Sequence, residues 1–133
     1  HSDVAAVTGP PIPLVFAVAQ PTVDLGPLPS MADAWVLHPT SGALVYIGAY
    51  AISVAAWDAY VERYFMKYLF ISPRSFPSVG QALRLALADV VKLFLPNTGL
   101  PTQYSEMYQI LGDPSLELPD LYPYKYYFPW ITN

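Results

Sequence analysis

The chain contains no cysteine among its 133 residues. This absence excludes disulfide bonds, thiolate metal ligands and any cysteine nucleophile supplied by the chain itself. Charged residues are also scarce, at 12% of the sequence, against about 25% in an average soluble domain. Six of them are Lys or Arg, and these are scattered, so we expect no nucleic-acid partner. A surface with so few charges predicts contact with other protein chains.

Long hydrophobic runs are missing as well. The longest stretch suited to a membrane, residues 43–57, has about fifteen apolar or small residues, whereas a spanning helix needs about 20. We therefore expect no transmembrane segment. The chain begins with His1 and shows no charged region followed by an apolar one, so no signal peptide is visible. We interpret it as a mature product or a piece of a longer protein.

Hydrophobic residues, by contrast, make up 54% of the chain, enough for the core of one domain. Residues 12–19 and 43–49 are continuous apolar runs, typical of strands buried on both faces. Between them, Ser30 and Asp33 form a capping-box pattern that predicts a short helix over 30–38. Strand, helix and strand in this order predict two adjacent parallel strands.

The second half of the domain has a helical period. Apolar residues at 3.6-residue spacing predict helices over 57–70 and 78–94, and a shorter helix from Thr102 to Leu111 that ends at Gly112. Asp113 is expected to cap a turn, and residues 115–118 form a candidate edge strand. No pattern indicates a metal or another cofactor.

The last fifteen residues, 119–133, contain three prolines and six aromatic residues. An aromatic segment with so little charge is expected to pack against its own domain or a neighbouring chain. We therefore divide the chain into a domain over 1–118 and a C-terminal arm over 119–133.

Three motifs then occur in a fixed order: LVFAVAQPTVD at residues 14–24, SGALVYIGA at 41–49 and LGDPSL at 111–116. Together with the 78–94 helix, they resemble the C-terminal half of the catalytic domain in the gingipain family of caspase-like cysteine peptidases. The resemblance covers about residues 3–118. It implies a partial three-layer caspase-like α/β fold, with a parallel sheet flanked by helices, and an extracellular or cell-surface location.

The chain departs from the family at the residues that carry the chemistry. Gln20 stands where the resemblance places the nucleophilic cysteine, and a carboxamide has no acidic proton to lose and no nucleophilic electron pair of useful basicity. The histidine that would activate a thiol is expected before the first residue of this sequence, because residues 3–9 resemble the segment that follows it. The cysteine mechanism is therefore absent from the chain.

Several residues near this position remain candidates. Gln20 is either a substituted nucleophile in a pocket that still binds peptide or a polar loop residue. Thr22 and Asp24 lie nearby, but without a histidine or terminal amine a Thr–Asp pair is a weak nucleophile and base. His38 is expected to cap a helix C-terminus rather than act as a base. Trp57 either anchors the core, which its helical neighbours favour, or lines a specificity pocket.

Two functions follow from these observations. The chain is either a non-catalytic gingipain-like domain that serves as a structural or interaction module, or a processed fragment of a gingipain-like endopeptidase whose histidine lies on another chain. In both cases the expected partners are other protein chains, among them the N-terminal half of the same precursor. A His-Gly pair immediately upstream would favour the second function.

Overall fold

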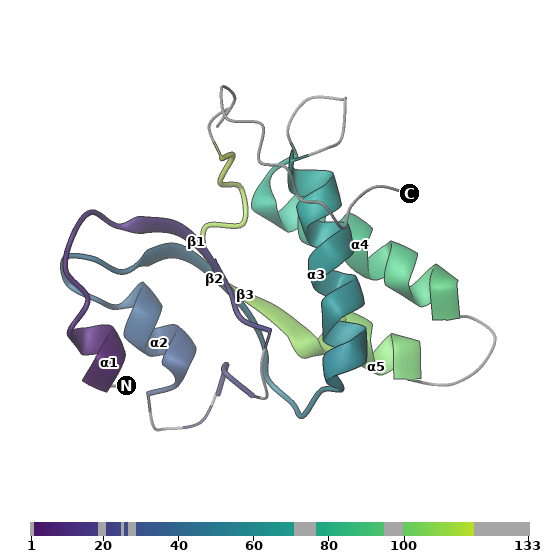
Figure 1. Ribbon diagram of the computed structural model, residues 1–133, viewed down its shortest axis with the longest axis horizontal. Coiled ribbons are helices and arrows are strands. Elements are labelled where there is room, and N and C mark those ends of the chain that lie inside the picture. Colours follow the sequence, from purple (N-terminus) through teal and green to yellow (C-terminus); the bar gives the residue numbers. More distant parts are fainter. Residues whose placement is uncertain are drawn as a thin grey trace.

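A computed structural model describes residues 2–18, 21–24, 26, 29–70, 77–94 and 100–118. The elements follow in the order α1 (Ser2–Ala5), β1 (Ile12–Phe16), α2 (Met31–Val36), β2 (Ala43–Ala49), α3 (Ala55–Phe70), α4 (Val79–Phe94), α5 (Leu100–Met107) and β3 (Tyr108–Gly112). Helices α1 and α2 lie on one side of the sheet, and α3 and α4 lie side by side on the other (Figure 1). This arrangement confirms the mixed α/β fold with helices on both sides of a sheet.

The sheet has the strand order β1-β2-β3. Strands β1 and β2 are parallel, with Ile12 opposite Ala43 and Phe16 opposite Ile47, as the strand–helix–strand pattern predicts. Strand β1 ends at Phe16, before the expected residue 19. Strand β3 is antiparallel to β2, so the sheet of this partial domain is mixed.

The central strand β2 connects the two helical layers. Its alternate residues Val45, Ile47 and Ala49 are buried in the core beneath α3 and α4. The residue between them, Tyr46, belongs to a smaller cluster on the α2 side with Val23 and Ala32. Because successive side chains of a strand point to opposite faces, one short apolar run supplies both cores.

Helices α3 and α4 close the larger core. On α3, Val61, Phe65 and Leu69 are buried at i, i+4 and i+8, the spacing of one helix face. The ring of Phe65 lies 4.9 Å from that of Phe16 on β1. Removing a buried Phe side chain typically costs about 3–5 kcal/mol, so this contact fixes α3 firmly against the sheet.

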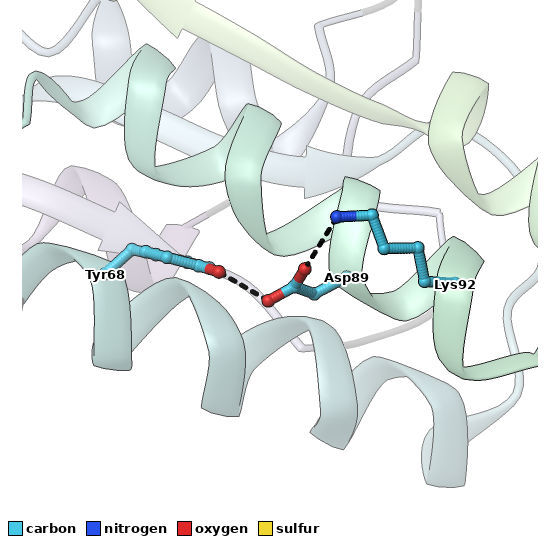
Figure 2. Close-up of polar contacts among 3 residues, drawn as sticks. All are labelled: Tyr68, Asp89 and Lys92. Atoms are coloured by element: carbon cyan, nitrogen blue, oxygen red, sulfur yellow. Dashed lines mark hydrogen bonds and ion pairs between the residues drawn. The ribbon is translucent and has the colours of Figure 1, made fainter.

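A group of polar contacts joins α3 and α4 at their outer surface. Tyr68 of α3 donates a hydrogen bond to the Asp89 carboxylate of α4, whose other oxygen lies 3.4 Å from Lys92 Nζ (Figure 2). The hydrogen bond to Asp89, with burial and the negative charge adding to it, raises the pKa of Tyr68 to about 12. Exposed ion pairs contribute little to stability, so the hydrogen bond from Tyr68 to Asp89 contributes more than the Lys92–Asp89 ion pair.

The predicted helix over 102–111 is wrong in its second half. Helix α5 ends at Met107, and Tyr108–Gly112 form β3. Residues Tyr108 to Gly112 pair with Ala49 to Val45, and this tertiary pairing overrides a helical spacing of apolar residues. Gly112 is not a helix C′ residue: it has a φ of 101°, and a Cβ there would overlap with the Leu44 carbonyl oxygen.

The segment after β3 forms a turn and not the expected edge strand over 115–118. Asp113 caps this turn, as predicted, because its Oδ1 accepts hydrogen bonds from the hydroxyl (2.6 Å) and the backbone N–H (2.8 Å) of Ser115. These bonds lower the pKa of Asp113. The carbonyls of Pro114 and Leu116 accept hydrogen bonds from the first N–H groups of α4. The turn therefore caps α4.

The capping box that begins α2 is confirmed. Ser30 Oγ accepts from the Asp33 N–H at 3.1 Å, and the Asp33 carboxylate accepts from the Ser30 N–H at 2.8 Å. The backbone and hydroxyl donors of Ser30 lower the pKa of Asp33. Helix α2 is shorter than the expected 30–38 and ends at Val36. The arm over 119–133 lies outside the described residues, and its separation from the domain stays a prediction.

Candidate functional site

The candidate site lies at the carboxyl edge of β1 and β2, where both strands lead into loops. The Ala17 N–H still bonds the Ile47 carbonyl at 2.8 Å. The loop then returns to the end of β2, because the N–H groups of Thr22 and Val23 both bond the Ala49 carbonyl, at 3.0 and 3.2 Å. Gln20 lies outside the described residues, but these bonds fix the chain on both sides of it.

Two buried hydroxyl groups meet behind this loop. Thr22 is 8% exposed and Tyr46 is fully buried, and neither hydroxyl has a hydrogen-bond partner among the described residues. Burial raises the pKa of Tyr46, and the neighbouring Thr22 hydroxyl offsets part of that rise. Both side chains lie against Gly48, because a Cβ built there would meet Thr22 Oγ1 and Tyr46 Cε1. A Cβ at Gly48 would overlap with Thr22 Oγ1, so this close approach requires glycine.

Asp24 lies on the solvent side of the same loop. Its Oδ1 accepts the Gly26 N–H at 2.9 Å, which makes it the side chain of a local turn. Among the described residues, no hydrogen bond joins the Asp24 carboxylate to the Thr22 hydroxyl. A hydroxyl nucleophile needs an adjacent base to take its proton, and the two side chains do not form such a pair here.

His38 is remote from this edge. It follows α2 and lies before β2, where its Nδ1 accepts the Ser41 N–H at 3.0 Å. The expected role as a helix cap is wrong, because α2 ends two residues earlier with Leu37 as its C-cap. An Nδ1 that accepts a hydrogen bond carries no proton, so the ring orders the turn before β2. Among the described residues, no histidine stands beside Thr22.

Trp57 lies in the first turn of α3, and its side chain is partly buried. Its ring is 3.8 Å from that of Phe94 at the end of α4, centroid to centroid, and it packs against the larger core. This position supports the interpretation as a core anchor. A role in lining a specificity pocket stays a prediction.

A buried acidic group at this edge was not predicted. Asp58 is 3% exposed, and its two carboxylate oxygens accept hydrogen bonds from Ser53 Oγ at 2.5 Å and Tyr108 Oη at 2.7 Å. Ser53 precedes α3 and is within local reach, but Tyr108 comes from β3, fifty residues further along the chain. The sequence pattern placed Tyr108 on a helix, so it gave no signal of this contact.

The described residues contain no group of three or more His, Cys, Asp or Glu side chains placed to hold a metal ion. None of the helices in that part of the chain combines the length and the apolar character needed to cross a membrane. Asp58 is engaged by two hydroxyls and Asp24 by a local turn, so neither carboxylate is bonded to the Thr22 hydroxyl as a base would be.

Comparisons with known proteins give one finding for the chain as a whole. The model of peptidase family C25 matches residues 3–119. No curated protein and no solved structure matches the chain. The matched range begins before β1 and ends beyond the turn that caps α4, so it includes both strands of the candidate site and every helix that packs on the sheet.

Proposed function

Because the chain belongs to peptidase family C25, the gingipain family, we propose that it is a peptidase homologue without catalytic activity, acting as a structural or interaction module in a larger assembly. One observation carries this proposal: a chain matched to a cysteine-peptidase family over 3–119 contains no cysteine. In this proposal Gln20 stands where the resemblance over residues 14–24 leads us to expect the nucleophile.

The described side chains that follow position 20 in the sequence also support the absence of catalysis. A hydroxyl can replace a thiol only where a base accepts its proton. The Thr22 hydroxyl is buried beside Gly48 and has no hydrogen-bond partner among the described residues, and Asp24 is engaged with the Gly26 N–H. Neither side chain supplies the missing nucleophile and base.

The alternative is a processed fragment of a gingipain-like endopeptidase whose histidine lies on a separate chain. One feature favours it: β1 is an edge strand of the described sheet, with β2 on one side. An unpaired strand edge can accept a further strand from another chain. Such a strand could come from the N-terminal half of the same precursor. Under either proposal, family membership supports an extracellular or cell-surface location.

Peptidase assays test the main proposal. The purified chain is offered fluorogenic peptides with Arg, Lys and other residues before the scissile bond, and we expect no turnover above buffer. The variant Gln20→Cys should gain a thiol that reacts with alkylating agents and has an ordinary pKa near ~8.5, but no activity. Gln20→Ser is the matched control without a thiol.

Two outcomes would contradict the proposal in different ways. Turnover by the unmodified chain, lost in Thr22→Val or Asp24→Asn, would reveal a nucleophile that the carboxyl edge does not show. Turnover by Gln20→Cys only after addition of a separately made N-terminal half would instead favour the fragment. The intact mass of the native polypeptide decides whether residue 1 is a cleavage product.

A further inference from the structure

An apolar surface lies where α3 begins and α4 ends. Ile52, Tyr60 and Leu93 are 75%, 39% and 50% exposed, and in the chain they precede α3, follow Trp57 by one turn and precede Phe94, the two residues whose rings pair. We call these five residues the apolar patch. Exposed clusters of large apolar side chains of this kind mark surfaces that contact other protein.

Ring contacts join three residues of the apolar patch, one from α4 and two from α3. Phe94 lies 3.8 Å from Trp57 and 5.3 Å from Tyr60, centroid to centroid, the second in an edge-to-face arrangement. The Trp57 N–H bonds the Val54 carbonyl at 2.8 Å, which holds the loop containing Ile52 against the start of α3.

The loop that leads into the apolar patch carries no charge, and the cation next to Leu93 in the chain, Lys92, is paired with Asp89 at 3.4 Å. Residues 39–57 contain no charged residue, and the next acidic side chain, Asp58, is buried. An occupant with a strong net charge would find no counter-charge in this loop. The chemistry of the apolar patch therefore fits an aromatic segment without net charge.

The C-terminal arm has that chemistry. Residues 119–133 contain four tyrosines, one phenylalanine and one tryptophan, with a single Asp and a single Lys that cancel in charge. Of these aromatic residues, Tyr126, Tyr127, Phe128 and Trp130 fall in the second half of the arm.

The length of the arm matches the distance it must cover. The arm follows Leu118, close to the start of α4, because the Val79 N–H bonds the Leu116 carbonyl at 2.9 Å. Helix α4 has sixteen residues, which places Phe94 about 24 Å from its start. About eight extended residues cross that distance, which leaves residues 127–133 to lie on the patch.

We propose that the C-terminal arm docks on the apolar patch of its own chain, running back along α4 and placing its last aromatic residues over Trp57 and Phe94. Covalent attachment favours this occupant over a second copy, because a short tether keeps the arm at an effective concentration in the millimolar range. The proposal concerns the assembly of the domain and does not depend on whether position 20 is catalytic.

Disulfide trapping tests the proposal directly, because the chain has no native cysteine. Thr132→Cys near the end of the arm is combined with Ala56→Cys, an exposed position one helical turn before Tyr60. The matched control combines Thr132→Cys with Ala5→Cys, which is exposed at the end of α1 on the opposite side of the sheet (Figure 1). Both pairs replace the same residue types outside the apolar patch.

We expect an intramolecular disulfide in the Ala56→Cys pair to form at least about tenfold faster than in the Ala5→Cys pair. Replacing Tyr127, Phe128 and Trp130 by Ser should remove this preference, whereas replacing Tyr122 and Tyr124 by Ser should preserve it. Equal rates for the two pairs would overturn the proposal. Disulfide-linked dimers that form in proportion to protein concentration would also overturn it, in favour of a second copy.

Discussion

Removing the buried hydroxyl of Tyr46 is expected to stabilise the protein, whereas most substitutions destabilise one. Tyr46→Phe removes one oxygen from a fully buried side chain and leaves the ring in place, so no cavity of consequence forms. Burying a hydroxyl without a partner costs about 1–3 kcal/mol in proteins. Because the described residues offer this hydroxyl no hydrogen bond, we expect Tyr46→Phe to raise the free energy of unfolding by about 1 kcal/mol.

Tyr108→Phe is the matched control, because it removes the same atom from a tyrosine whose hydroxyl does form a hydrogen bond. The Tyr108 hydroxyl donates to the buried Asp58 carboxylate at 2.7 Å, and a hydrogen bond to a charged group contributes about 1.5–3 kcal/mol. Urea denaturation followed by tryptophan fluorescence gives both free energies by linear extrapolation. In thermal melts, each 1 kcal/mol should shift Tm by about 3–5 °C.

The combined variant Thr22→Val with Tyr46→Phe distinguishes two close groups from a bonded pair. A hydrogen bond between the hydroxyls should appear as an interaction energy above about 0.5 kcal/mol in this double-mutant cycle, and a smaller value supports two groups that are not bonded to each other. A loss of about 1 kcal/mol or more in Tyr46→Phe, in the same direction as the control, would refute the reasoning, since it would show that the hydroxyl has a partner such as an ordered water.

Three further results are expected. Tyr68→Phe should lower the free energy of unfolding by about 0.5–1 kcal/mol below pH 10. Because the pKa of Tyr68 in the folded protein, about 12, exceeds the ordinary value of 10.0, this difference from the parent chain should shrink as pH rises from 10 to 12. A difference that stays constant over that range would contradict the proposed role of the Tyr68 hydroxyl. Gly112→Ala should lower the free energy of unfolding, measured by urea denaturation, by more than about 2 kcal/mol, because the added Cβ overlaps with Leu44 and φ is unfavourable for alanine. Gly9→Ala is the control, with a φ of 127° and open space around the added Cβ, and it should lower that free energy by about 1 kcal/mol. Equal losses in the two variants would show that the overlap with Leu44 has no effect on stability. Asp58→Ala should lower the free energy of unfolding by about 2–4 kcal/mol, and a neutral result in the same assay would show that the buried carboxylate contributes no net stability.

The parts of the fold that depend on local pattern were predictable from sequence. The apolar run Ala43–Ala49 is the central strand, and the capping pattern at Ser30 and Asp33 begins α2. The division between α5 and β3 was not predictable, because Met107 and Tyr108 continue a helical spacing while the backbone changes to a strand that pairs with β2. Pairing with a strand that is distant in sequence determines the conformation of these residues, and the local sequence pattern does not indicate that pairing.

The same limit applies to the candidate site. The position of residues 21–24 after the first strand followed from the order of the predicted strands. The meeting of Thr22 with Tyr46, and of Asp58 with Tyr108, depends on side chains from different elements. No spacing rule links such residues, so their contacts emerge only from the folded chain.

The order in which β2 finds its neighbours has a consequence for synthesis on the ribosome. Strand β2 can pair with β1 as soon as residue 49 has emerged, but its other neighbour ends at Gly112, opposite Val45. At about 5–20 residues per second, roughly 60 residues take about 3–12 s to be made. During that interval one edge of an apolar, uncharged strand stays open to association with other nascent chains. The antiparallel pairing with β3 is therefore the step that covers this edge of β2, the central strand of the described sheet.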